Sequence, residues 1–187
     1  MFITVSIMLN VTGFWINVTL GLPLFLDSIG TILAAVILGP WLGALTGFLS
    51  NLISGIVANP VNIPFGLTNA AIGLIVGYLS RKRGFTDFLT PLYAALILTF
   101  ACPILATPIA VYLFGGATGG KIDTFFALMI ESGHHIYSSA FLVRLPANFA
   151  DKLISAYLVM LLIRFFPDAW KTKNYKQNLS KDKAASS

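Results

Sequence analysis

The stretch LPANFADKLIS at residues 145–155 runs directly into the apolar stretch AYLVMLLIRFF at residues 156–166. Together they are long enough to supply the roughly 20 residues with which a helix crosses the hydrocarbon core of a bilayer. Four polar residues at the start of this segment are spaced i, i+3, i+4 and i+7, which places them on one face of a helix. They are Asn148, Asp151, Lys152 and Ser155. The stretch therefore predicts a membrane-spanning helix with a polar site near one end.

The whole chain has the composition of an integral membrane protein. It is 57% hydrophobic and 10% charged over 187 residues, whereas a soluble domain is about one quarter charged. Apolar runs between Gly, Pro and charged breaks predict one transmembrane domain, 1–187, built as an all-α six-helix bundle. The predicted spans are 3–20, 26–39, 41–57, 65–80, 90–113 and 147–166, with the first span interpreted as a helix rather than a removed signal peptide.

The net charge of +5 is better explained by topology than by a nucleic-acid partner. Lys and Arg gather in RKR at 81–83 and in the tail at 167–187. Short loops rich in Lys and Arg remain cytoplasmic, and six spans place both groups on that side. We therefore predict a multi-pass protein of the bacterial cell membrane with both termini cytoplasmic.

The segment 114–146 between the fifth and sixth predicted spans contains TFFALMIESGHHIYSSAFLV, which is long enough to be a seventh span. A seventh span would export the basic tail, and the polar residues near its centre are costly in lipid. We expect this segment to form an extra outer-face helix or lid, although partial insertion of 124–145 stays open.

Small and polar residues recur every three or four positions on the third and fourth predicted spans. Such stripes let membrane helices approach closely, and bundle packing alone is an adequate explanation for the glycines. The stripes comprise Gly43, Gly47, Asn51, Ser54 and Ala58, followed by Gly66, Ala70, Gly73 and Gly77.

Several polar residues are predicted to converge on a single site at the outer ends of these spans. Lys152, oriented by Asp151, is expected to meet a ligand carboxylate. Two residues of the lid are further candidates, and Trp15 and Phe65 offer flat faces that are equally typical of packing. The predicted substrate-binding residues are Asn51, Asn59, Asn62, Asn69, Glu131, His134, Asn148, Asp151, Lys152 and Ser155.

Three other sequence features are not interpreted as ligand-binding sites. Asp27 and Ser28 are expected to cap the second helix. His134 and His135 are adjacent in sequence and make a poor metal pair, so no metal site or cofactor is predicted. GGATGGKI at 115–122 lacks the hydroxyl that a phosphate-binding loop needs after its Lys. With no nucleophile and base in view, the chain is predicted to bind a ligand rather than to catalyse a reaction or to hydrolyse ATP.

Three stretches carry a family resemblance. LPLFLDSIGTILAAVILGPWLGALTGFLSNLISGI, NPVNIPFGLTNAAIGLIVGYLSRK and LPANFADKLIS resemble the substrate-binding S components of energy-coupling factor (ECF) vitamin transporters, most closely the pantothenate and hydroxymethylpyrimidine group. The resemblance spans about residues 5–166. It implies a six-helix bundle that holds a vitamin near the outer face under its connecting loops.

The resemblance also implies partners. S components work with a transmembrane coupling subunit and two cytoplasmic ATPases, and their first helix usually carries an A-x-x-x-A docking surface. Here Ser6 and Asn10 stand at the small positions, so this chain departs from that pattern.

The substrate that we favour from the sequence is pantothenate, because Lys152 and the asparagines suit a small ligand with hydroxyl, amide and carboxylate groups. Hydroxymethylpyrimidine and riboflavin remain alternatives. A membrane sensor domain is the alternative from another class, followed by an integral-membrane enzyme.

Overall fold

A computed structural model of the chain describes residues 1–85 and 87–165. These residues form seven α-helices and no strand. The helices are α1 (Phe2–Leu20), α2 (Ile29–Leu38), α3 (Pro40–Val57), α4 (Asn62–Arg83), α5 (Leu89–Phe114), α6 (Ile122–Glu131) and α7 (Ile136–Phe165).

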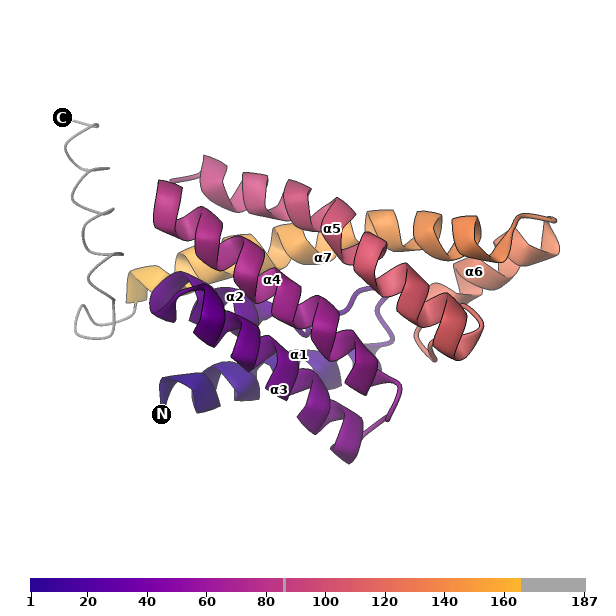
Figure 1. Cartoon of the computed structure of the whole chain (residues 1–187), viewed down its shortest axis with the longest axis horizontal. Helices are drawn as coiled ribbons and strands as arrows, with labels where there is room; N and C mark the ends of the chain where they lie inside the picture. Colours follow the sequence, from indigo (N-terminus) through magenta and orange to yellow (C-terminus); the bar gives the residue numbers. More distant parts are fainter. Residues whose placement is uncertain (86, 166–187) are drawn as a thin grey trace.

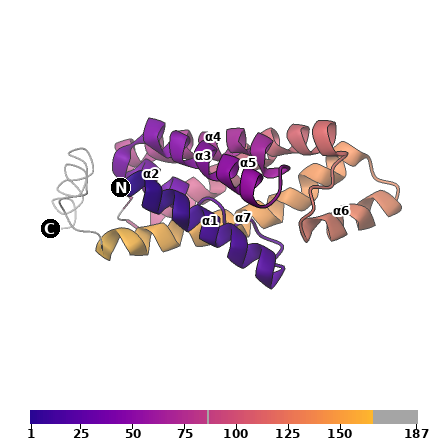
Figure 2. The same cartoon turned by 90° about the horizontal axis from the view of Figure 1, so that it is seen from below.

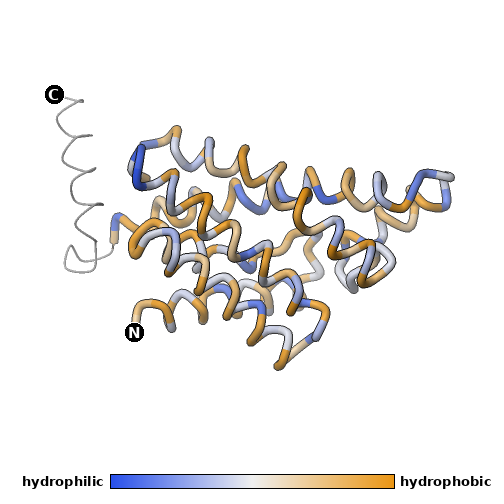
Figure 3. The backbone as a smooth tube through the Cα atoms, in the orientation of Figure 1, coloured by the Kyte–Doolittle hydropathy of each residue, from blue (hydrophilic) through white to orange (hydrophobic). Residues whose placement is uncertain are grey.

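Five of these helices, α1, α3, α4, α5 and α7, are long and apolar enough to cross a membrane. Their outer surfaces carry many exposed large apolar side chains, such as Trp41, Phe100 and Leu161, which is the surface expected of helices solvated by lipid. Figure 3 shows hydrophilic residues mainly at the ends of the bundle and at a few interior positions. The chain is therefore a multi-pass membrane protein.

The short helix α2 lies at the centre of the fold. Eight of its ten residues are buried, as expected for a helix that is apolar on all sides. At about 1.5 Å per residue it is roughly 15 Å long, half the thickness of a hydrocarbon core. The predicted second span, 26–39, is thus shorter than expected, because residues 22–28 form a non-helical segment that leads into it.

The other helices surround α2. Figure 1 shows the amino terminus, the α4–α5 connection and the end of α7 at one end of the bundle, with α6 at the other. Seen from below, α1 and α7 lie under α3 and α4 (Figure 2). The connections α1–α2, α3–α4 and α5–α6 therefore gather toward the end where α6 lies.

The region predicted as a lid is only partly a separate element. Residues 122–131 form α6, but Ile136 already begins α7, which continues unbroken through Pro146 to Phe165. The helix predicted for 147–166 therefore starts eleven residues earlier, because Pro146 does not end it. Residues 166–187, including the predicted basic tail, lie outside the described part of the chain.

Glycines on α3 and α4 allow the two backbones to touch. A Cβ added at Gly73 would overlap the backbone of Gly43 and Ala44, and one added at Gly77 would overlap Pro40. At the junction of α2 and α3, Gly39 has φ 99°, a conformation that side chains rarely adopt, and Pro40 starts α3. The small residues thus fix a close α3–α4 pair, as packing in membranes requires.

The side chain of Asn10 ties α1 to the core. Its Nδ2 donates to Thr31 Oγ1 at 2.8 Å and to Ser50 Oγ at 2.9 Å, and its Oδ1 accepts from the Gly30 backbone N–H at 2.7 Å. Asn10 is 1% exposed and Ser6 is fully buried. The two residues expected to dock the coupling subunit therefore face inward, onto α2 and α3, and do not lie on an accessible surface.

Candidate functional site

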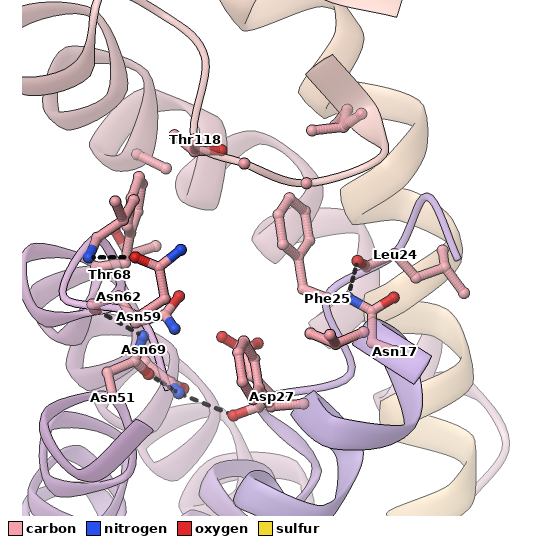
Figure 4. Close-up of a pocket in the computed structure, with 18 of the residues that line it drawn as sticks. Asn17, Leu24, Phe25, Asp27, Asn51, Asn59, Asn62, Thr68, Asn69 and Thr118 are labelled. Carbon is pink, nitrogen blue, oxygen red and sulfur yellow. Dashed lines mark hydrogen bonds between the residues drawn. The ribbon is translucent and has the colours of Figure 1, made fainter. Parts of the chain in front are cut away.

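A cavity of about 490 Å³ lies under the three gathered connections. It is lined by α1, α3, α4, α5 and α7, by the first residue of α6, and by the loops α1–α2, α3–α4 and α5–α6. Figure 4 shows Asp27 at one end of it and Thr118, in the α5–α6 loop, at the other. We call the first the deep end, formed by Asp27, Asn69 and Lys152, and the second the loop end. This volume lies within the range of small-molecule sites.

The Lys152 ammonium at the deep end is held by two partners. Its Nζ donates to Ser28 Oγ at 2.8 Å and to the Asp151 carboxylate, with which it forms a salt bridge. Both side chains are almost fully buried. A buried charge of this kind is tolerated when it is paired and hydrogen-bonded, so the ion pair is a fixed part of the fold, with one ammonium hydrogen left for a further acceptor.

The second oxygen of Asp151 holds the α1–α2 loop. Asp151 Oδ1 accepts from the Leu26 backbone N–H at 2.7 Å. Leu26 has φ 53°, the one positive φ among the described residues other than glycine, and such a conformation costs of order 1 kcal/mol or more. A Cβ at Gly13 would overlap the Leu26 carbonyl. The loop is thus pressed against α1 and anchored to α7.

A chain of amides joins α3, α4 and the same loop (Figure 4). Asn69 Nδ2 donates to Asn51 Oδ1 at 2.7 Å and to the Asp27 backbone carbonyl at 2.9 Å. Asn51 Nδ2 donates to the Asn62 carbonyl at 3.2 Å. Asn69 Oδ1 and Asn62 Nδ2 are buried without a partner in the described chain. Since buried polar groups are normally paired, these two atoms leave the amide cluster incompletely satisfied.

Asp27 does not cap α2 as expected. Neither it nor Ser28 makes a side-chain capping hydrogen bond to that helix; Ser28 serves Lys152 instead, and Asp27 lines the cavity. The prediction was wrong because Leu26 turns the chain before the helix begins. Burial raises the pKa of the Asp27 carboxyl in this loop, while the nearby Lys152 opposes the rise.

The loop end is closed by the glycine-rich segment 115–121. Asp123 Oδ2 accepts from the backbone N–H groups of Thr118 at 2.8 Å and Gly119 at 2.6 Å, so the amides that a phosphate would need are already used. Arg144 donates to the carbonyls of Ala140 and Gly116. These bonds hold the segment over the cavity.

Aromatic side chains form part of the wall. Phe14, Trp15, Phe25 and Phe65 all line the cavity. Phe14 and Trp15 meet edge to face at 6.1 Å, and Phe65 stacks on Phe114 at 6.2 Å. Such pairs present rigid apolar faces to a bound molecule.

The predicted site residues fall into three groups. Six line the cavity: Asn51, Asn59, Asn62, Asn69, Asn148 and Lys152. Asp151 and Ser155 are buried behind it, where Asp151 holds Lys152 and Leu26 and the Ser155 hydroxyl has no partner. Glu131, the last residue of α6, and His134, in the turn that follows, are exposed and lie outside the cavity lining.

Sequence reasoning missed other polar groups of the lining, notably Asn17, Thr68, Thr118 and Arg144. Asn17 lies seven residues after Asn10 in α1 and thus on the same helix face, a spacing that was available as a signal. Thr118 and Arg144 carry no such signal, since their place depends on how the α5–α6 loop folds back.

The arrangement provides the features of a binding site. It combines one carboxylate, one ammonium, several amides and aromatic walls in an enclosed space, with no nucleophile activated by a neighbouring base among the described residues. In the same part of the chain, no group of three His, Cys, Asp or Glu side chains could hold a metal ion.

Comparison with known proteins gives one match. A family model described as "ECF transporter, substrate-specific component" matches residues 1–163. No curated protein and no solved structure matches the chain. Because the family model covers most of the chain, including every helix that lines the cavity, the chain belongs to the family of ECF transporter substrate-specific components.

Proposed function

We propose that the cavity under the three loops binds a water-soluble vitamin or vitamin precursor, which the protein presents to the rest of an ECF-type importer. Members of this family are substrate-binding membrane subunits rather than enzymes, and they associate with coupling and ATPase subunits. The observation that carries the proposal is the set of polar side chains that line the cavity. The Asp27 carboxylate, the Lys152 ammonium and several asparagine amides line it within an otherwise apolar membrane bundle.

Polar groups inside a membrane bundle are costly and generally serve a function. Lipid-facing helices need no asparagine cluster for association, because small-residue stripes such as that of Gly73 and Gly77 already provide close packing. A hydrated nutrient has to exchange its water for protein groups on binding, and the polar side chains of the lining supply the replacements.

The proposed orientation places the cavity toward the cell exterior and Arg81–Arg83, in the last turn of α4, toward the cytoplasm. This follows the distribution of basic residues. In this proposal α2 completes the count of six bundle helices without crossing the bilayer by itself, and α6 with the glycine-rich segment forms the outer cover.

Pantothenate is the substrate favoured by the sequence, and the remaining ammonium hydrogen of Lys152 is the feature that supports it. Hydroxymethylpyrimidine and riboflavin suit the aromatic wall instead. Each compound is small enough for a cavity of about 490 Å³.

A binding screen with purified protein tests the proposal. Isothermal titration with pantothenate, hydroxymethylpyrimidine, riboflavin and further water-soluble vitamins is expected to yield one ligand that binds with 1:1 stoichiometry. Copurification of the coupling and ATPase subunits from the native membrane is expected in parallel. A folded protein that binds none of the vitamins would overturn the proposal and favour a sensor or scaffold domain.

A further inference from the structure

The Asp27 carboxylate is the one charged group of the deep end that has no hydrogen-bond donor from another described side chain. It lines the cavity, and Figure 4 shows its side chain directed into the open space. Lys152, the nearest cation, already donates to Asp151 and Ser28. Asp27 therefore presents acceptor oxygens to whatever occupies the cavity.

The position of Asp27 is fixed from both sides. The preceding residue, Leu26, is held by Asp151 through its backbone N–H, and the Asp27 carbonyl accepts from Asn69 Nδ2. The strained φ of Leu26 shows that the surrounding contacts, rather than local preference, set this turn. A carboxylate held in this way is preorganised for a ligand rather than free to turn away.

The charge balance of the deep end disfavours an anion. Asp27 and Asp151 contribute two negative charges and Lys152 one positive charge, so the end is net negative when all three are ionised. The cations Arg144 and Lys121 belong to the loop end, where Asp123 accompanies them. A ligand carboxylate placed beside Lys152 would have to lie close to the Asp27 carboxylate, and like charges at such a distance repel strongly in a poorly solvated site.

The oxygens of Asp27 are the acceptors that face the open cavity at this end. The amide atoms Asn69 Oδ1, Asn17 Oδ1 and Asn62 Nδ2 and the Thr68 hydroxyl are buried without a partner in the surrounding wall. The Asp27 oxygens call for a ligand group that donates hydrogen bonds. The aromatic side chains Phe14, Trp15, Phe25 and Phe65 line the same cavity and favour a flat ring.

We infer that Asp27 selects the substrate by accepting a hydrogen bond from the exocyclic amino group of a planar nitrogen heterocycle, with no anionic group at the deep end. The inference rests on the proposed function, because it takes the cavity as the vitamin site. A carboxylate oxygen that accepts from an N–H group makes a charge-assisted hydrogen bond, which is stronger than a neutral one. Of the substrates considered, an aminopyrimidine such as hydroxymethylpyrimidine fits this description and pantothenate does not.

Isothermal titration of the purified full chain with hydroxymethylpyrimidine and pantothenate tests the inference. The pyrimidine is expected to bind more tightly. Asp27→Asn is expected to weaken its binding by about 10- to 100-fold, the effect of losing hydrogen bonds to a charged group. Asp87→Asn, the same change at an exposed position in the α4–α5 connection at the opposite end of the bundle, serves as the control and should leave binding unchanged.

A second arm needs no variant. The analogue in which a ring carbonyl replaces the 4-amino group has an acceptor where the proposal requires a donor, and it should bind the wild-type protein at least about tenfold more weakly. Equal binding of the two pyrimidines, or tighter binding of pantothenate, would overturn the role of Asp27 while leaving the proposed vitamin site intact. Failure of every vitamin in the screen would instead overturn the proposed function itself.

Discussion

The ion pair of Asp151 and Lys152 has a structural task beside the ligand contact that the sequence predicts for Lys152. Lys152 lines the cavity, and its ammonium donates to both Asp151 and Ser28. Asp151 also carries the strained Leu26. The pair therefore stabilises the structure of the deep end of the cavity.

Lys152→Met tests this structural task. Removing the ammonium leaves the Asp151 carboxylate buried without a counter-charge, and the expected loss of stability is about 3–5 kcal/mol. The double variant Asp151→Asn with Lys152→Met should recover much of the loss, because an amide oxygen still accepts from Leu26 and no charge remains. Thermal melting in detergent measures both. A single variant as stable as the wild type would contradict the buried pair.

Asn10→Ala tests the polar link between α1 and the core. The variant leaves the Gly30 N–H without its acceptor and Thr31 and Ser50 without their donor, and it is expected to destabilise the fold by about 1–3 kcal/mol. Thr12→Ala, at an exposed position of the same helix, is the matched control. Equal melting temperatures for the two variants would show that the link contributes nothing to stability.

Some site residues could be predicted from the sequence and others could not, depending on the kind of residue. Asn51, Asn69 and Lys152 were predictable as cavity residues because they interrupt apolar runs at helical spacing. Asp27 was misassigned, since Asp before an apolar run usually signals a helix cap. Its actual direction depends on the positive φ of Leu26, which no pattern of residue types predicts.

At the scale of elements, the presence of the long helices could be predicted from the sequence, but the ends of two helices could not. Five spans follow from apolar length alone. The start of α2 could not be predicted in this way, because residues 22–28 are as apolar as a helix yet lie in a loop. The start of α7 could not be predicted either, because Pro146 lies within the helix rather than at its start. Pro is tolerated inside membrane helices where neighbours satisfy the freed groups.

The α3–α4 contact gives a prediction at this scale. Gly73→Ala places a methyl group against the backbone of Gly43 and Ala44, so the helices must separate, at an expected cost of about 1–3 kcal/mol. Gly66→Ala on the same helix meets mainly the flexible Phe48 side chain, 3.2 Å from the added Cβ, and should cost less. Melting curves that rank Gly66→Ala as the more harmful change would contradict the close packing.

At the scale of the whole molecule, the three loops and the basic end lie at opposite ends of the bundle (Figure 1). This polarity predicts their sides of the membrane. In a Cys102→Ala background, a membrane-impermeant thiol reagent should label Ser132→Cys on intact cells. Lys82→Cys should react only after the membrane is opened. Both positions are exposed, and the reverse labelling pattern would overturn the proposed orientation.

Family membership indicates which partner subunits the protein has. The described chain offers a binding cavity, and membership of the family implies association with coupling and ATPase subunits. The docking residues predicted on α1 are buried here, so the surface used for docking has to be sought among the exposed residues of the bundle.

The central claim is that the cavity under the three loops is the ligand site, and a matched pair on α5 tests it most directly. Ala106 lines the cavity, whereas its neighbour Leu105 is 42% exposed on the outer surface. Titration of both phenylalanine variants with the vitamin identified in the screen should show binding lost in Ala106→Phe and retained in Leu105→Phe. Unchanged binding by a folded Ala106→Phe protein would contradict the claim.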